Sequence, residues 1–369
     1  MRRILLLIVF ALSSMSPLAQ SQELRPVTVA SGLDHPWGLA FLPDGRMLVT
    51  ERPGRLRIVG PDGQVGPPVT GLPRVDAGGQ GGLLDIVLDP KFSDNARVYF
   101  SYSEPGQDAD GQPANSTAVA RAQLDGNRLV ILQVIFRQRP KVASSAHFGS
   151  RLVFARDGRL FITLGDRFSR RDDAQSLDTH HGKVVRIEAD GTVPADNPFV
   201  GRAGALPEIW TYGHRNMQGA ALHPATGELW THEDGPQGGD ELNIEFAGKN
   251  YGWPVITYGR EYVTGLKIGD GTTRADVPAP LTVWIPSIAP SGMAFLTSDR
   301  YPGWKGNLFV GALRGQALLR LELDGRQVVK EQRLLPGLGE RIRDVRQGPD
   351  GWLYLLTDSP QGRVIRLER

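Results

Sequence analysis

The feature that most constrains the fold of this chain is a hairpin pattern that occurs six times along it. Each copy has an apolar segment, a turn with Asp-Gly or a variant of it, and a second segment in which apolar residues alternate with others. Asp-Gly and Asn-Gly supply the positive φ that tight hairpin turns require, and β-branched and aromatic residues favour a half-buried pleated surface. The copies span residues 38–52, 83–103, 150–166, 219–235, 292–313 and 342–358.

The number and order of these hairpins predict an all-β fold, a six-bladed β-propeller with four-stranded antiparallel blades. Six copies over about 345 residues leave about 58 residues for each, which is enough for four strands and some long loops. A pair of β-sandwiches is the main alternative, but it would not explain six copies with one internal order. Helical repeats are disfavoured because 45 Gly and 27 Pro would break helices. Residues 362–369 are expected to close the ring by pairing with the blade formed by the mature N-terminus.

The first residues have the layout of a secretory signal peptide. Arg2 and Arg3 precede an apolar run over residues 4–12, and small residues follow it. The run is too short to span a bilayer as a permanent helix, although a retained anchor is the alternative. We therefore expect residues 1–22 to be a leader, residues 23–369 to form a single catalytic propeller domain, and the protein to be periplasmic. No other segment is apolar enough to cross a membrane.

Charge and cysteine content exclude several classes of function. The formal net charge of the full chain is +2, and removal of the leader with its two arginines brings the mature chain to zero. Net charge therefore gives no reason to expect that the protein binds nucleic acid or an anionic membrane. The chain has no cysteine, which excludes disulfides, thiolate catalysis, Cys-ligated zinc and iron–sulfur clusters. It also lacks a P-loop and a G-x-S-x-G nucleophile elbow.

The first candidate for chemistry is His147 together with Asp166. His147 precedes the innermost segment of its repeat and should point towards the axis, while Asp166 ends the following segment, so a hairpin would bring the two together. A carboxylate beside an imidazole fixes its tautomer and raises its basicity, as a general base requires. The alternative is an ordinary loop histidine and a turn aspartate, and spacing alone favours that alternative.

The second candidate is a group of polar residues at blade-edge positions in separate repeats, namely Arg215, Asn216, Arg314, Arg341 and Arg343. Arg341 and Arg343 are two residues apart, so on a strand they share one face. If these side chains converge on the axis, they form a site for a polyanion, because Arg binds carboxylates in a bidentate manner. The alternative is ordinary surface arginine.

Two Gly-rich segments could lie close to a metal or a ligand. Residues 232–243 combine Gly, Pro and acidic groups, whose oxygen atoms suit Ca²⁺, although an acidic surface turn is the alternative. Residues 78–82 permit close backbone approach to a flat ligand, with Gln80 as the one polar contact. The longest inserts, residues 165–213 and 234–290, should lie on one face around the axis, where binding usually occurs.

Taken together, the segments resemble the soluble PQQ-dependent glucose/sorbosone dehydrogenase family, the pyrroloquinoline quinone (PQQ)-dependent aldose sugar dehydrogenases of the bacterial periplasm. The resemblance covers essentially the whole mature chain, and the shared order of the segments is more specific than any one of them. The segments are HPWGLAFLPDGRMLVTERPG, GGQGGLLDIVLDP, HFGSRLVF, HGKVVRI, YGHRNMQG, GPQGGDELN, GKNYGWP, PSGMAF and RIRDV. The family's fold is a six-bladed propeller with PQQ over the axis, which agrees with the number of hairpins.

The resemblance implies a role for each matching position. His147 matches the catalytic base and Asp166 its supporting carboxylate. Residues that match PQQ contacts are Gln80, Arg215, Asn216, Arg341 and Arg343. The carbonyls of Gly235 and Pro236 match ligands of a Ca²⁺ that touches PQQ, and Glu241 with the carbonyl of Tyr251 resembles a second, structural Ca²⁺ site.

Two positions depart from the family pattern. Arg314 stands where the family usually has Lys, so a planar fork replaces a point charge. Asp234 stands before Gly235 where histidine is common, and it adds an anion beside the expected metal, which should strengthen cation binding.

The activity that the resemblance implies is oxidation of aldose sugars at the anomeric carbon to aldonolactones, with hydride transfer to PQQ and electrons passed to an external acceptor. A Ca²⁺-dependent lactonase-type propeller is an alternative, but it needs Asp, Asn and Glu side chains as direct axial ligands, whereas the axial candidates here are mostly Arg, His and Gln. A non-catalytic binding propeller is the other alternative, and it would not need arginines from separate blades to meet. The sequence does not indicate which sugar is preferred.

Overall fold

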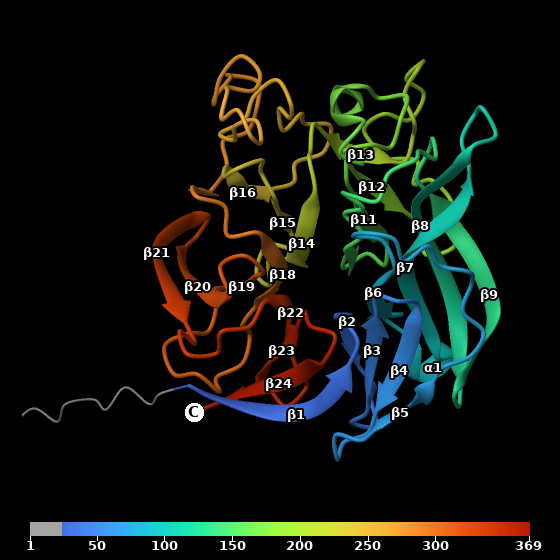
Figure 1. Ribbon diagram of the computed structural model, residues 1–369, viewed down its shortest axis with the longest axis vertical. Helices are drawn as coiled ribbons and strands as arrows, with labels where there is room; N and C mark the ends of the chain where they lie inside the picture. The colour runs from blue at the N-terminus through green and yellow to red at the C-terminus, as the bar shows by residue number, and fades with distance from the viewer. Residues whose placement is uncertain (1–23) are drawn as a thin grey trace, which may run out of the picture.

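A computed structural model describes residues 24–369, and it forms a ring of six four-stranded antiparallel sheets (Figure 1). The predicted all-β, six-bladed propeller is thus confirmed. The expected leader, residues 1–22, lies outside the described residues. Within residues 24–369 the helical segments are α1 (Phe92–Asn95) and the 3-10 turn η1 (Arg171–Gln175), and no helix there is long and apolar enough to span a bilayer.

The blades follow one another along the chain, and each runs from its first strand on the inside to its fourth on the outside. Blade one has β2 (Pro36–Phe41), β3 (Met47–Glu51), β4 (Arg55–Val59) and β5 (Val65–Pro68). Blade two has β6 (Leu83–Leu88), β7 (Arg97–Gln107), β8 (Pro113–Asp125) and β9 (Arg128–Arg137). Blade three has β10 (Leu152–Phe154), β11 (Leu160–Leu164), β12 (Lys183–Ile187) and β13 (Ile209–Tyr212).

The second half of the ring repeats this order. Blade four has β14 (Met217–Leu222), β15 (Leu229–Glu233), β16 (Asp240–Ile244) and β17 (Thr282–Trp284). Blade five has β18 (Pro290–Phe295), β19 (Leu308–Ala312), β20 (Ala317–Asp324) and β21 (Gln327–Leu334). Blade six has β22 (Ile342–Gln347), β23 (Leu353–Thr357), β24 (Gly362–Glu368) and, as its outer strand, β1 (Arg25–Leu33).

Each of the six sequence hairpins forms the first two strands of a blade. In five of them the first strand carries a bulge near its beginning, where its register against the second strand shifts. A β-bulge bends the strand and re-aims its side chains. These bulges lie at the end of the ring where the candidate site is found.

The ring closes through the two ends of the chain. Strand β1 pairs antiparallel with β24, with Arg25 opposite Glu368 and Thr28 opposite Ile365. The expectation that residues 362–369 close the ring is therefore confirmed, with the N-terminal segment contributing the outermost strand of blade six. Closure leaves no blade with an unsupported side, because each sheet packs between two others.

The apolar core is divided among the interfaces between neighbouring blades. Leu48 and Phe100 belong to the cluster between blades one and two, and Trp230 and Val310 to the cluster between blades four and five. The other four interfaces have clusters of the same kind. Burial of this apolar area holds the blades at fixed positions around the axis.

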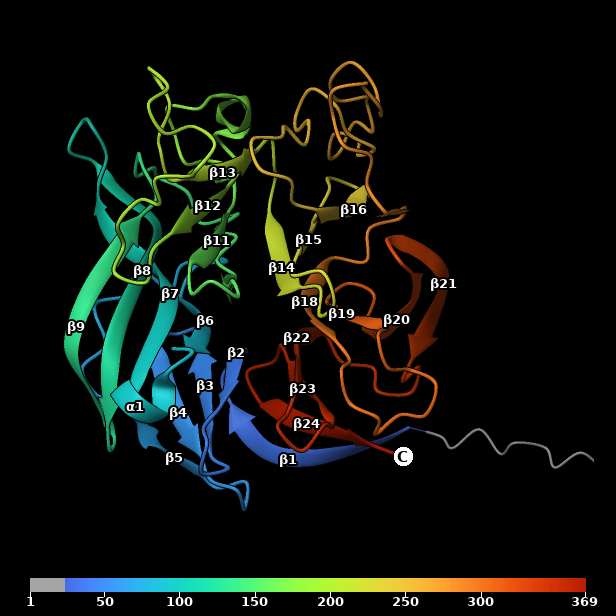
Figure 2. The same cartoon turned by 180° about the vertical axis from the view of Figure 1, so that it is seen from behind.

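The long loops of blades three and four lie side by side at one edge of the ring in both views (Figures 1 and 2). Arg171, in the loop between β11 and β12, forms an ion pair with Glu261, in the loop between β16 and β17, at 2.7 Å. Both loops contribute residues to one cavity at the site. The predicted grouping of residues 165–213 and 234–290 is thus present.

Candidate functional site

The functional residues predicted from the sequence gather at the end of the ring where first strands begin and second strands end. A cavity of about 270 Å³ lies there, and we call it the axial cavity. Each blade, or the turn that leads into it, contributes to its wall. One residue from each is Trp37, Leu84, Phe148, Asn216, Leu313 and Arg343. Because its wall comes from every part of the ring, this cavity sits over the axis.

Two further cavities lie near the axial cavity. The side cavity, about 310 Å³, is lined by His147 and Asp166, and a small cavity of about 10 Å³ lies next to it. Asp234 lines both the axial and the small cavity, while Arg215 and Trp253 line both the small and the side cavity. The small cavity therefore lies between the axial and side cavities and shares wall residues with each, and the three spaces differ in lining chemistry.

His147 and Asp166 form the predicted pair. Their side chains are buried, and His147 Nδ1 lies 2.6 Å from Asp166 Oδ1. Asp166 is held in turn by the backbone N–H of Phe168 and by the indole Nε1–H of Trp253, each 2.8 Å away. A carboxylate accepts hydrogen bonds, so Nδ1 carries the proton and Nε2 is left free to accept one. This is the tautomer that a general base needs.

The electrostatics of the pair keep the imidazole neutral near pH 7. Burial and the positive charge of Arg215 lower the pKa of His147, and the hydrogen bond to Asp166 opposes this only in part. Burial would raise the pKa of Asp166, but the hydrogen bond to His147 and the charge of Arg215 hold the pKa below its ordinary value. The pair therefore consists of a neutral imidazole and a carboxylate.

The backbone at His147 adopts a conformation that few side chains tolerate. Its φ is +52°, in the left-handed region, and such strain persists only where the surroundings enforce it. One constraint is Gly165, where a Cβ would come within 2.1 Å of the His147 carbonyl oxygen. Another is Gln80, whose Oε1 accepts the His147 N–H at 2.8 Å. Gln80 also lines the axial cavity, so it contacts both parts of the site.

Arg167, which the sequence reasoning missed, clamps the loop that carries His147. It is fully buried, and its guanidinium donates to the carbonyls of Ala146 at 3.0 Å and Ser144 at 2.6 Å. It also donates to Asn115, to the carbonyl at 3.1 Å and to Oδ1 at 2.6 Å, and it lies 3.8 Å from the centre of the Phe148 ring. Its only sequence signal is its place directly after Asp166.

Arg215 and Asn216 project from the turn that leads into β14. The Arg215 guanidinium donates to the Asp234 carbonyl at 2.7 Å and to the Tyr262 hydroxyl at 3.1 Å. Asn216 Oδ1 accepts the Gly149 N–H at 3.2 Å, and its Nδ2 donates to Asp234 Oδ2 at 3.2 Å. These contacts tie blades three and four together across the site.

Arg341 and Arg343 meet at one carboxylate on the opposite side of the axial cavity. Both guanidinium groups lie 3.2 Å from Asp358 Oδ2, and His35 Nδ1 lies 2.9 Å from Asp358 Oδ1. Burial would raise the pKa of Asp358, but Arg343, His35 and Arg341 hold the pKa far below its ordinary value. Arg343 is buried and its Nε has no hydrogen-bond partner, whereas the Arg341 side chain is 46% exposed.

Arg314 is not brought to the wall of the axial cavity. Its neighbour Leu313 lines that cavity, while Arg314 itself is exposed. The physical reason is its position in the tight turn after β19, which directs it away from the strand end. Contact with a ligand over the axis would require this side chain to turn inward past Leu313.

The acidic residues of blade four surround the small cavity. Asp234, Gly235 and Glu241 line it together with Tyr251. Burial and the neighbouring Asp240 raise the pKa of Asp234 to about 8, while burial and nearby Glu233 raise the pKa of Glu241 to about 8. Pro236 lines the side cavity instead, and its carbonyl accepts the Arg260 N–H at 3.0 Å. The carboxylates thus lie where a cation would favour their charged forms.

Several other site residues escaped the sequence reasoning. Trp253 donates to Asp166, Trp37 and Phe148 form flat walls, and Asp240 accepts N–H groups from Gly235 at 2.9 Å and, in the next blade, Ile288 at 2.8 Å. Asp358 had a usable signal. It follows the second strand of its hairpin, the position that Asp166 and Asp234 occupy in theirs.

The sequence model of the glucose/sorbosone dehydrogenase family matches residues 33–366. The chain belongs to this family. Curated proteins similar to this chain include the aldose sugar dehydrogenase YliI of Escherichia coli, 46% identical over 91% of this chain and 90% of that protein. The quinoprotein glucose dehydrogenase B of Acinetobacter calcoaceticus is 27% identical over 92% of this chain and 87% of that protein.

A solved structure of a similar protein contains a bound cofactor. The PQQ-bound form of the aldose sugar dehydrogenase from Streptomyces coelicolor aligns with a TM-score of 0.77 at 29% identity, covering 94% of this chain and 98% of that one. That structure establishes PQQ binding for the Streptomyces protein.

The residues of the axial cavity fit a flat, multiply anionic molecule. Trp37 and Phe148 provide planar walls, and Arg341 and Arg343 share one carboxylate. The unpartnered Nε of Arg343 is a buried donor with unused capacity. Asp234 Oδ1 is a buried acceptor without a hydrogen-bond partner, as expected beside a cation site. The donor set thus suits PQQ carboxylates on one side and Ca²⁺ on the other.

Proposed function

We propose that this protein oxidises aldose sugars at the anomeric carbon to aldonolactones with PQQ and Ca²⁺, and that it passes the electrons to an external acceptor. The observation that carries the proposal is the position of the His147–Asp166 pair in the wall of the side cavity. The small cavity separates this cavity from the axial cavity, which is lined by arginines from separate blades. A lactonase-type propeller would instead need carboxylates and amides as axial metal ligands, and a binding propeller would not need an oriented base.

His147 is the proposed general base. Its free Nε2 takes the proton of the anomeric hydroxyl, while Asp166 stabilises the imidazolium that forms and Trp253 fixes Asp166. When bound, PQQ would supply the hydride acceptor for the anomeric carbon, and Ca²⁺ would supply Lewis-acid polarisation of the quinone. Loss of that hydride and that proton converts the hemiacetal to a lactone and balances the reaction.

The remaining residues hold the cofactors in this proposal. Gln80, Arg215, Asn216, Arg341 and Arg343 bind PQQ, with Arg314 as a contact at the rim. The carbonyls of Gly235 and Pro236 hold the Ca²⁺ beside it, and Glu241 with the Tyr251 carbonyl holds a second. Asp234 adds a charged oxygen near the first ion.

We also propose that the enzyme works in the periplasm after removal of residues 1–22, with residues 23–369 as its one catalytic domain. The support for export is the basic start and the short apolar run at the N-terminus. Mass spectrometry of the protein recovered from a periplasmic extract would give the cleavage point.

The deciding experiment adds PQQ and Ca²⁺ to the purified apoprotein and measures reduction of an artificial electron-accepting dye with an aldose. We expect reduction only when PQQ, Ca²⁺ and the aldose are all present, and a lactone as product. Hydrolysis of a lactone without PQQ would instead indicate a propeller hydrolase. Neither activity would indicate a binding protein.

A further inference from the structure

Arg167 is a buried cation without a carboxylate partner in the part of the chain that the structure describes. Its side chain is fully buried, and its hydrogen bonds go to neutral oxygen atoms of Asn115, Ser144 and Ala146. Burial lowers the pKa of Arg167 to about 10, so the guanidinium is still charged at pH 7. A buried charge without a counter-ion is costly, and a neutral side chain of similar size would avoid that cost. The effect of this arginine therefore has to lie in its charge and its donors.

Arg186, a buried arginine of the same blade, shows the ordinary arrangement. Its guanidinium donates to Asp196 Oδ1 and to Asn197 Oδ1, each at 2.8 Å, and it lies 4.2 Å from the centre of the Trp210 ring. Arg167 also has an amide and an aromatic ring as neighbours. The two residues differ in the carboxylate, which Arg186 has and Arg167 lacks.

The donors of Arg167 join two separate parts of the chain beside the catalytic base. On one side they bind the carbonyls of Ala146 and Ser144, directly before His147. On the other side they bind the carbonyl and the side chain of Asn115, in β8 of blade two. The backbone of Arg167 holds the same loop, because its N–H donates to the His147 carbonyl at 3.3 Å and its carbonyl accepts the Ser144 hydroxyl at 2.7 Å.

The segments that Arg167 joins contain residues in the left-handed region of backbone conformation. The φ angle is +52° at His147, +57° at Arg167 and +60° at Phe168. Residues other than glycine adopt this region only where the surroundings enforce it. Loss of the Arg167 contacts would let the backbone at His147 relax, and the imidazole would then move from Asp166 Oδ1, which lies 2.6 Å from its Nδ1.

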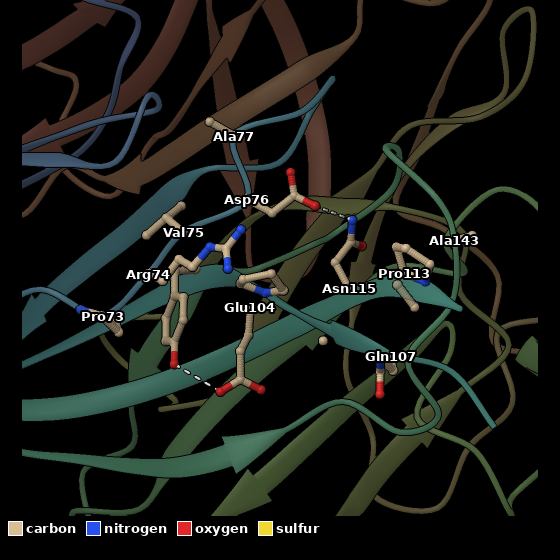
Figure 3. Close-up of a pocket in the computed structure, with 14 residues that line it drawn as sticks. Pro73, Arg74, Val75, Asp76, Ala77, Glu104, Gln107, Pro113, Asn115 and Ala143 are labelled. Atoms are coloured by element: carbon tan, nitrogen blue, oxygen red, sulfur yellow. Dashed lines mark hydrogen bonds between the residues drawn. The ribbon is translucent and has the colours of Figure 1, made fainter. Parts of the chain in front are cut away.

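Asn115 separates Arg167 from the nearest carboxylate on the blade-two side. Asn115 Nδ2 donates to Asp76 Oδ2 at 2.8 Å, and both residues line a cavity of about 730 Å³ (Figure 3). Asp76 Oδ1 accepts the Gly78 N–H at 3.0 Å, which fixes the carboxylate in this position. The amide thus stands between the two charges and keeps them from forming an ion pair.

The charge of Arg167 acts on the catalytic base. The charged groups that face His147 are Asp166, Arg215 and Arg167. Burial and the charges of Arg215 and Arg167 lower the pKa of His147, whereas Asp166 raises it. The neutral imidazole is the form that can take up a proton. Arg167 therefore favours the reactive form of the base without lining the side cavity.

We propose that Arg167 is a positioning residue for the general base, a buried cation that fixes the loop carrying His147 and sets the electrostatic potential at its imidazole. The proposal rests on the function proposed above and adds a residue that contacts neither sugar nor cofactor in that scheme. Asn115 is part of the arrangement, because it accepts two of the hydrogen bonds and holds the carboxylate of Asp76 apart from Arg167.

The first test examines the imidazole of His147 in the apoprotein by NMR with ¹⁵N-labelled histidine. The spectrum of His147→Gln identifies its signals. In Arg167→Met the pKa of His147 should rise, and a mixture of tautomers should replace the single one. Arg167→Lys keeps the charge without the planar fork, so the pKa should stay close to the native value while the tautomer is less fixed. Arg186→Met is the matched control and should change neither.

A second variant keeps the hydrogen bonds and moves the charge. In Asp76→Asn/Asn115→Asp the amide and the carboxylate exchange places, so the net charge is unchanged and a carboxylate lies against the guanidinium of Arg167. The new amide at position 76 can donate to the new carboxylate, which still accepts from Arg167. We expect the pKa of His147 to rise with its tautomer preserved. This variant decides the electrostatic part of the proposal even if Arg167→Met does not fold.

The kinetic test uses the enzyme loaded with PQQ and Ca²⁺. Arg167→Met should lower kcat about 10- to 100-fold, the scale of a misplaced catalytic group, with KM for the aldose and the Kd for PQQ little changed. Arg167→Lys should recover part of the loss. The proposal is overturned if Arg167→Met leaves the pKa and the tautomer of His147 unchanged, if the exchange variant leaves that pKa unchanged, or if kcat falls no further than in Arg186→Met. Failure of the wider proposed function has a different signature, because the native protein would then oxidise no aldose while the NMR results would stand.

Discussion

Two arginine-containing regions lie along the axis of the ring, one above the other, and they differ in how their charges are matched. In the lower region, Arg151 lies 3.3 Å from Asp85 and 3.1 Å from Asp344, and Arg346 lies 2.7 Å and 2.8 Å from the same two carboxylates. These four residues come from blades two, three and six, and two positive charges meet two negative ones. We call them the axial plug.

The upper region, the axial cavity, has no such balance. Arg341 and Arg343 share Asp358, and Arg52 also lines the cavity. Arginines whose charges are matched one for one by buried carboxylates act as structure, as Arg151 and Arg346 do in the plug. Arginines with spare donors beside an open space can bind a ligand. The same residue type therefore has different roles, which are set by what surrounds it.

The largest expected effect comes from breaking the plug. Arg151→Met should lower the free energy of unfolding by about 3–5 kcal/mol, because it leaves Asp85 and Asp344 buried with one cation between them. Chemical denaturation of the apoprotein measures this. Arg341→Met, at a half-exposed site in the upper region, serves as the control and should cost far less. If the two variants lowered the free energy of unfolding equally, the distinction between structural arginines in the plug and ligand-binding arginines in the cavity would be wrong.

Replacement of His147 should lower the turnover rate without weakening the binding of PQQ. His147→Ala should lower kcat by about a hundredfold or more, the usual scale for a lost general base, and leave PQQ bound. Rapid kinetics with PQQ absorbance measured in the same sample checks both. His223→Ala, outside the site, is the control. Near-normal turnover with PQQ in place would exclude His147 as the base.

The arginine of the axial cavity that has an unpartnered donor should contribute to the affinity for PQQ. Arg343→Met should raise the Kd for PQQ about 10- to 100-fold, the scale of one charged hydrogen-bonded contact. Arg343→Lys keeps the charge without the planar fork and should have a smaller effect. Fluorescence titration of the apoprotein gives both constants. An unchanged Kd in the methionine variant would mean that Arg343 belongs with the structural arginines.

The smallest expected effect is on the pH dependence of kcat/KM. Because burial and Arg215 lower the pKa of His147, the imidazole stays neutral and able to act as a base below its ordinary pKa of 6.5. The acid limb of kcat/KM should therefore lie below pH 6.5, with activity lost as the pH falls through the lowered pKa. Arg215→Met should move that limb to higher pH. A limb at or above pH 6.5 in the native enzyme would contradict the assignment.

The fold and part of the site were predictable from the sequence because their causes are local. The six hairpins depend on turn residues and on alternation along each strand. His147 and Asp166 were paired because one hairpin joins them, and Arg341 and Arg343 because they are two residues apart. Arg314 was grouped with them by its repeat position, but a tight turn carries it outward, and repeat position does not encode that direction.

Other contacts could not be found in this way because they join distant parts of the chain. Trp253 reaches Asp166 across 87 residues, and Arg346 reaches Asp85 across 261. Arg167 likewise joins Asn115, at the start of β8 and 52 residues away, to the loop that carries His147. Nothing in the spacing of these residues indicates that they meet.

The amino-acid sequence by itself determined the number of blades, the order of their strands and the type of chemistry available, because turn conformation and side-chain alternation act over a few residues. Only the tertiary structure decided which arginines are matched by carboxylates and which are left free. That matching depends on ring closure, which brings strand ends from all six blades to one axis and removes them from water together.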